Sequence, residues 1–285
     1  MQNHQLLASF YSPEFLGSPD FSLVIPCYCE APFLRASVLR LVDLLSVGKF
    51  QYEMVFVEDN SPDQTLSILS DLVVELRNRG VSHSIIAHKK NMGRGAAVKT
   101  GIHAAKGKIA GFIDIDLENS PDAIFPMYAL IDSQELDLVV GARVQFGAEL
   151  RPIRRLTHLI YKWLVHSLVS LPVSDTETGL KLFRREAIAA LLELTENNHW
   201  FWDTEVVLVA HACGLKVGQH PVLFYRDATK QSTVRIVRDS FLYLKALVEY
   251  RRWPIKTRVL LEANRKETAE ESLGYSSARP EVPDA

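Results

Sequence analysis

The regular alternation of strand-length apolar runs with helix-like segments is the feature that most constrains the fold of this chain. The stretch FSLVIPCY (21–28) has the composition of a buried strand, and residues 30–48 follow with apolar positions at helical spacing, ended by Gly48. The same alternation continues, with strands expected within 52–63, 82–89, 108–116 and 136–143 and helices at 64–80 and 93–107. It predicts an α/β fold with a mostly parallel central sheet, helices on both faces and right-handed crossovers.

Acidic residues stand at the ends of two of these strands. One strand ends in Glu58 and Asp59, and another ends in the run Asp114-Ile115-Asp116. Ligands of such sheets bind beyond the carboxyl ends of the strands. Alternate residues of an extended chain point to one side, so Asp114, Asp116 and Glu118 would repel one another unless a cation lies between them. The alternative is a loop whose acids are simply solvated.

Composition narrows the class of protein further. The chain has 285 residues, 47% of them hydrophobic, and a formal net charge of -2, which suits a globular domain and argues against nucleic acid as a partner. Three cysteines at unsuitable spacing predict free thiols in a reducing cytosol. No signal peptide is recognised, and no apolar run reaches the roughly 18 to 20 residues of a membrane span. We therefore expect a cytoplasmic protein, with peripheral contact at the cytosolic face of a membrane as a further option.

The chain outside the alternating region divides into flanking segments. Residues 1–20 are expected to form an N-terminal extension to a globular domain at 21–232, a helix is expected over 233–253, and 254–285 is expected to be a disordered polar tail. Within the domain, residues 151–173 mix arginines with apolar residues at helical spacing. Such an amphipathic helix either rests on lipid headgroups or packs on the core of the domain.

Seven short motifs in one order carry a resemblance that covers about residues 20–250. They are VIPCYCE (24–30), VEDNSPDQT (57–65), NMGRGAAVKTG (91–101), DIDLENSP (114–121), GAR (141–143), LPVSDTETGLKLFRREA (171–187) and WFWDTEVVLVAHACGLKV (200–217). Together they resemble a family 2 glycosyltransferase with the GT-A fold. The likeness is greatest to the dolichyl- or polyprenyl-phosphate mannosyl- and glucosyltransferase branch. By contrast, the glycine segment at 93–95 matches neither the GxGxxG nor the GxxxxGK spacing.

The resemblance implies a site for a nucleoside diphosphate sugar, either a UDP- or a GDP-hexose. Its donor-binding residues would be Pro26, Tyr28, Glu30, Asp59, Gly93, Arg94, Gly95, Asp114, Ile115 and Asp116. Asp114 and Asp116, with Glu118, would hold Mg²⁺ or Mn²⁺ through oxygen ligands. The cation would stabilise the charge that develops on the leaving nucleotide, so Asp116 also counts as catalytic.

The acceptor side is assigned from the later motifs. Asp203 and Glu205 are the candidate catalytic acids, because related transferases place an acid near the attacking group. Candidate acceptor and phosphate ligands are Arg143, Asp175, Arg226 and Lys230. The sequence departs from the branch at Leu180-Lys181, where an aromatic residue and arginine are usual, and at Ser232-Thr233-Val234, where a lysine is usual.

These observations predict a metal-dependent, inverting glycosyltransferase that moves a hexose to a polyprenyl phosphate. A lipid phosphate needs no general base, because its oxygen is already anionic, and Asp203 would then position other groups. A soluble acceptor with a sugar or metabolite hydroxyl is the alternative, and Asp203 or Glu205 would then act as the base. A second alternative is a nucleotide-sugar-binding protein without transfer activity.

Overall fold

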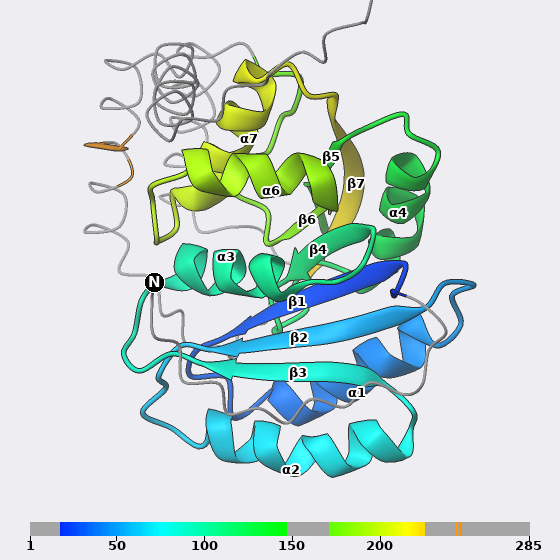
Figure 1. Cartoon of the computed structure of the whole chain (residues 1–285), viewed down its shortest axis with the longest axis vertical. Helices are drawn as coiled ribbons and strands as arrows, with labels where there is room; N and C mark the ends of the chain where they lie inside the picture. The colour runs from blue at the N-terminus through cyan, green and yellow to red at the C-terminus, as the bar shows by residue number, and fades with distance from the viewer. Residues whose placement is uncertain (1–17, 147–170, 226–242, 244, 247–285) are drawn as a thin grey trace, which may run out of the picture.

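A seven-stranded sheet forms the centre of the computed structural model, which describes residues 18–146, 171–225, 243, 245 and 246 (Figure 1). Its spatial order is β3-β2-β1-β4-β6-β5-β7. The strands are β1 (Phe21–Cys27), β2 (Tyr52–Glu58), β3 (Ser82–Ala87), β4 (Ile109–Ile113), β5 (Leu138–Phe146), β6 (Leu180–Arg184) and β7 (Val217–Tyr225). The helices are α1 (Leu34–Leu45), α2 (Thr65–Asn78), α3 (Arg94–Ala104), α4 (Ile124–Asp132), α6 (Arg185–Leu194) and α7 (Trp202–Ala212), with a 3₁₀ turn η1 (Pro121–Ala123).

The sheet is mostly parallel, as predicted. β1 pairs in parallel with β2 and β4, β2 with β3, and β5 with β7. The exception is β6, which lies antiparallel between β4 and β5. The strand expected at 136–143 is β5, but the sequence analysis assigned no strand to β6 or to β7. The carboxyl ends of β1, β2 and β4 therefore share one edge with the start of β6.

Helices cover both faces of the sheet, which confirms the predicted fold class. One apolar core lies between the sheet and helices α1, α2 and α4, and it includes Leu41, Phe56 and Met127. The second core lies under α3, α6 and α7, which Figure 1 shows on the opposite face, and it includes Phe112 and Trp202. All seven residues of β1 are buried, as expected for a parallel strand enclosed on both faces.

Several predicted segments lie outside the described residues. They are the N-terminal extension up to residue 17, the amphipathic segment up to residue 170, most of the helix at 233–253 and the tail at 254–285. Among the helices that the structure does describe, none combines the length and apolar character needed to cross a membrane.

Candidate active site

A cavity of about 210 Å³ opens at the carboxyl ends of β1, β2 and β4. Nine of the ten predicted donor-binding residues line it: Pro26, Tyr28, Glu30, Asp59, Gly93, Arg94, Asp114, Ile115 and Asp116. Gly95 is the exception, because it is buried against Trp202, whose Cβ would lie 2.7 Å from a Cβ added to the glycine. The sheet thus brings together residues from four separate motifs, and it adds His199 and Trp200, which the sequence analysis did not assign.

Asp59 stabilises the loop that precedes α3, on one side of this cavity. Its carboxylate accepts hydrogen bonds from the backbone N–H groups of Met92 and Gly93, both at 2.8 Å, and lies 2.6 Å from Nδ1 of the buried His88. Gly93 has a φ of 96°, which glycine adopts readily, and an added Cβ would overlap the carbonyl oxygen of Asn198. Asp59 therefore fixes the start of α3, and its contact with a base or ribose stays a prediction.

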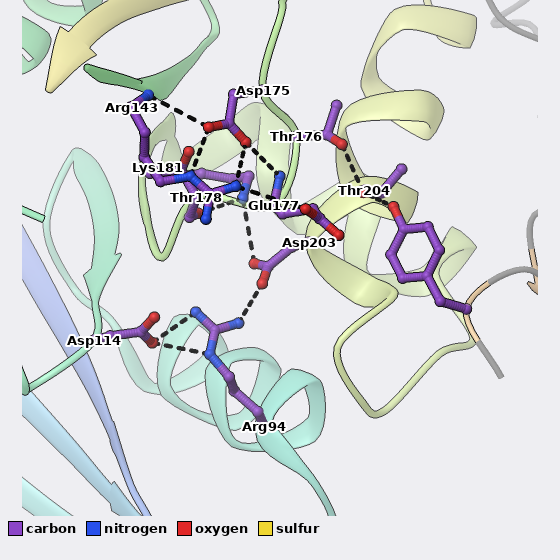
Figure 2. A network of polar contacts seen from close by, with 11 residues as sticks. Arg94, Asp114, Arg143, Asp175, Thr176, Glu177, Thr178, Lys181, Asp203 and Thr204 are labelled. Atoms are coloured by element: carbon purple, nitrogen blue, oxygen red, sulfur yellow. Dashed lines mark hydrogen bonds and ion pairs between the residues drawn. The ribbon is translucent and has the colours of Figure 1, made fainter. Parts of the chain in front are cut away.

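Arg94, the first residue of α3, connects Asp114 of the cavity to Asp203 on α7 (Figure 2). Its Nε and Nη2 donate to Asp114 Oδ1 at 2.9 and 2.7 Å, and its Nη1 donates to Asp203 Oδ2 at 2.5 Å. Burial opposes the positive charge, but the two carboxylates outweigh burial and raise the pKa of Arg94. Burial also raises the pKa of Asp114 to about 6, although Arg94 beside it favours the ionised form.

The predicted metal ligands fit a cation only in part. In the described portion of the chain, no three His, Cys, Asp or Glu side chains gather closely enough to hold a metal by themselves. Asp114 and Asp116 both line the cavity, whereas Glu118 does not and donates its backbone N–H to Asp116 Oδ1 at 3.2 Å. Mg²⁺ is usually bound by one or two carboxylates together with substrate phosphates, so this pair has suitable donor chemistry. The role of Glu118 stays a prediction.

Asp203 lies between two cations. Beyond its bond with Arg94, its Oδ1 is 3.3 Å from Nζ of Lys181, which also donates to the Thr178 carbonyl at 2.7 Å. The side chain of Lys181 is fully buried. Asp114, Arg94, Asp203 and Lys181 therefore form a row of alternating charges that crosses the site (Figure 2). Because each Asp203 oxygen is bound to a cation, this carboxylate is poorly placed to remove a proton.

Arg143 and Asp175, both predicted on the acceptor side, form a bidentate ion pair. Arg143 Nε donates to Asp175 Oδ2 at 2.7 Å, and Nη2 donates to Oδ1 at 2.9 Å. Burial disfavours the carboxylate, but Arg143 outweighs this effect and lowers the pKa of Asp175 to about 2. The other two predicted acceptor residues, Arg226 and Lys230, lie outside the described residues.

Glu205 is placed away from the cavity, and its geometry does not support the predicted catalytic role. Its two oxygens accept the backbone N–H groups of Glu196 at 3.1 Å and Asn197 at 2.9 Å. It stands two residues from Asp203 on α7, and residues two apart on a helix point in different directions. Glu205 therefore fixes the loop before α7.

Lys181 and Glu177 belong to the site but were not predicted as part of it. Lys181 appeared in the sequence as a departure from the family pattern, and a lysine inside the apolar run Leu180–Phe183 is a signal for a buried ion pair. Glu177 Oε2 lies 3.6 Å from Arg143 Nη2. No feature of local sequence distinguishes Glu177 from a surface acid, since the pairing depends on how β5 and the 174–179 loop meet.

Gly179 lies directly against the side chain of Asp114, and this close contact leads to a testable prediction. An added Cβ would overlap the carboxylate of Asp114, whose backbone N–H donates to the Gly179 carbonyl at 3.0 Å. We expect Gly179→Ala to reduce kcat/KM for sugar transfer by about a hundredfold, because misplacement of about 1 Å can cost that much. Gly80→Ala is the control: it has a φ of 68° and open space, so it should cost about 1 kcal/mol of stability and leave activity unchanged. Activity of Gly179→Ala within twofold of the wild type would contradict this reading.

The arrangement of the sheet and its helices is that of the GT-A fold, and comparison with solved structures agrees. Glucosyl-3-phosphoglycerate synthase from Mycobacterium tuberculosis, in complex with Mn²⁺, UDP and glucosyl-3-phosphoglycerate, superposes with a TM-score of 0.60 at 16% identity. The match covers 87% of this chain and 88% of that one. At this identity the likeness establishes the fold. The sequence model described as Glycosyl transferase family 2 matches residues 22–192. The chain belongs to this family of glycosyltransferases, as its motifs predicted.

Two curated relatives are similar to this chain over most of its length. Glycosyltransferase AglD of Haloferax volcanii is 30% identical over 224 residues, a match that covers 77% of this chain but only 35% of AglD. Dolichyl-phosphate beta-glucosyltransferase ALG5A of Trichomonas vaginalis is 25% identical over 259 residues, covering 85% of this chain and 78% of the relative. This chain thus spans about a third of the first relative and most of the second.

Proposed function

We propose that this chain is a metal-dependent, inverting glycosyltransferase that moves a hexose from a nucleoside diphosphate sugar to a polyprenyl phosphate. Transfer would take place at the cytosolic face of a membrane, where such an acceptor presents its phosphate. The engagement of both Asp203 oxygens by Arg94 and Lys181 is the observation that carries the choice of acceptor. The relative named as a dolichyl-phosphate glucosyltransferase supports the same class of acceptor.

The donor would occupy the cavity at the carboxyl ends of β1, β2 and β4. Tyr28 and Trp200 line it, each with 38% of its surface exposed, and offer flat aromatic surfaces for a base or a sugar ring. Asp114 and Asp116 would hold Mg²⁺ or Mn²⁺, which neutralises negative charge on a leaving diphosphate when bound. Arg94 would hold Asp114 in place from the opposite side.

The acceptor would approach from the side of Arg143. A phosphate monoester is anionic at neutral pH and attacks without a general base, so a charge-paired Asp203 is compatible with its reaction. The phosphate oxygen would displace the nucleotide from the opposite face of the sugar, which inverts the anomeric centre. Arg143, together with Arg226 and Lys230, would bind the acceptor phosphate, since guanidinium and ammonium groups are good phosphate ligands.

Thermal unfolding with a panel of nucleoside diphosphates tests the donor site. We expect one nucleotide to stabilise the protein in the presence of Mn²⁺ or Mg²⁺, by about 3 kcal/mol at a concentration near 100 times Kd. EDTA should abolish the stabilisation, and the matching nucleoside monophosphate should give much less. The absence of stabilisation by every nucleotide in a folded sample would contradict the assignment of this cavity.

Transfer of labelled sugar to undecaprenyl phosphate then tests the acceptor. The uncharged polyprenol is the matched control, because it keeps the lipid chain and replaces the phosphate with a hydroxyl. Product from the phosphate and none from the alcohol is the expected result. Product from the alcohol or from a soluble sugar would favour the hydroxyl-acceptor alternative.

A further inference from the structure

Arg143, the proposed ligand of the acceptor phosphate, is enclosed by two carboxylates in this structure. Asp175 holds it through two hydrogen bonds of 2.7 and 2.9 Å, and Glu177 approaches from the same loop at 3.6 Å (Figure 2). An anion that is to bind this guanidinium has to compete with a carboxylate already there. One of the two acids must therefore weaken its contact with Arg143 when a phosphate arrives.

The two acids differ in how firmly they are held. The side chain of Asp175 is 4% exposed, and its oxygens also accept the backbone N–H groups of Arg143 and Glu177. The side chain of Glu177 is 33% exposed, and its oxygen lies beyond hydrogen-bond distance of the guanidinium. Moving Asp175 would break its hydrogen bonds to Arg143 and to the Glu177 backbone. Moving the Glu177 side chain breaks only one long ion pair, with Arg143, among the contacts of the described residues. Glu177 is thus the acid that can be displaced.

We propose that Glu177 determines when the acceptor site can bind a phosphate. It shields Arg143 in the empty protein, and it must become the neutral acid and turn away before the phosphate of an acceptor can pair with Arg143. This inference rests on the proposed function, because it concerns the same phosphate acceptor. It assigns to Glu177 a role in binding of the acceptor phosphate and none in the chemistry of transfer.

The charges that surround Glu177 make this change accessible at neutral pH. Partial burial of its side chain raises the pKa of Glu177 to about 7, and the negative charges of Asp175 in its own loop and Asp203 on α7 act in the same direction. Arg143 on β5 and Lys181 on β6 oppose them. Below pH 7 the neutral acid predominates and Arg143 is available, and above pH 7 the carboxylate predominates and competes with the phosphate.

The sign of the pH effect follows from this competition. If only the neutral form of Glu177 admits the phosphate, the apparent Kd equals the intrinsic Kd divided by the fraction of neutral acid. Between pH 6 and pH 8 that fraction falls about tenfold for a pKa of about 7, so binding should weaken about tenfold. The acceptor phosphate, with a second pKa near 6, gains charge over the same range, which alone would favour binding slightly.

Calorimetric titration with farnesyl phosphate, in Mg²⁺ buffer and with farnesol as the uncharged control, tests the inference. For the wild type we expect Kd to rise about tenfold from pH 6 to pH 8. At pH 8, binding should take up close to one proton, measured by comparing two buffers of different ionisation enthalpy. Glu177→Gln should bind with a Kd that changes less than twofold over this range, about tenfold tighter than the wild type at pH 8, and without proton uptake. Glu177→Ala, as a second variant, should give the same flat profile.

Glu193→Gln is the matched control, because Glu193 is an exposed carboxylate on α6, with 69% of its side chain in solvent. It should keep the pH profile of the wild type. Equal profiles for the wild type and Glu177→Gln, with binding intact, would overturn the role of Glu177 and leave the phosphate acceptor standing. Failure of the wild type to bind farnesyl phosphate at pH 6 would overturn the proposed acceptor class, and the role of Glu177 with it.

Discussion

Replacing Asp116 with alanine is expected to lower kcat for sugar transfer by about a thousandfold while the protein remains folded. Asp116 lines the donor cavity next to Asp114, and together they supply the oxygen ligands proposed for the metal. The fold loses the hydrogen bond from the Glu118 backbone, which is 3.2 Å long and worth about 1 kcal/mol. Transfer assays at saturating Mn²⁺ and donor, with thermal unfolding of the same samples, measure both effects.

Asp71→Ala is the matched control for this experiment, because Asp71 is an exposed aspartate on α2 and is not among the residues that line the cavity. It should keep wild-type activity. Nucleotide binding provides a second readout: the stabilisation of Asp116→Ala by a nucleoside diphosphate should no longer depend on the metal. If this variant kept a tenth of the wild-type activity or more, the metal role of Asp116 would be wrong.

The sequence predicts the first half of the sheet well, because each of its strands is enclosed on both faces. A strand such as β1 has to be almost entirely apolar, and the following helix shows its buried face at helical spacing. The strand β6 escaped prediction for the opposite reason. It carries Lys181 and Arg184, and its position depends on pairing with β4 residues about 70 positions earlier, such as Gly111 with Leu182, and with β5 residues about 40 positions earlier. Local patterns contain no information about those partners.

A similar distinction holds for the site. Residues that follow parallel strands directly, such as Asp59, Asp114 and Asp116, can be assigned from sequence because the strand ends converge on one edge. The bond from Arg94 to Asp203 spans 109 positions and could not be foreseen. That bond changes the interpretation of Asp203, because a carboxylate paired with a cation is a poor candidate for a catalytic base. The position of an acid can be predicted from its motif, but its protonation and partners depend on packing between distant elements.

Lys181→Met is expected to lower the free energy of unfolding by about 3 kcal/mol, because removal of one member of a buried ion pair leaves a buried carboxylate oxygen of Asp203 without its cation, while Arg94 holds only the other oxygen. Methionine fills a similar volume but offers Asp203 and the Thr178 carbonyl no donor. Burial lowers the pKa of Lys181, and the carboxylate of Asp203 opposes this effect. Urea unfolding at pH 7.5 measures the loss, which corresponds to a decrease in Tm of about 6 to 12 °C.

A double-mutant cycle separates this electrostatic loss from simple repacking. Asp203→Asn removes the carboxylate charge that Lys181 neutralises in part, so the double variant with Lys181→Met should be about 1 to 2 kcal/mol more stable than the sum of the single changes predicts. Lys49→Met, at an exposed position, controls for the change of side chain and should alter stability by less than 0.5 kcal/mol. Additive single changes, or a loss below 1 kcal/mol for Lys181→Met, would show that Lys181 does not stabilise Asp203. Arg94 alone would then hold the carboxylate, and the row of alternating charges would end at Asp203.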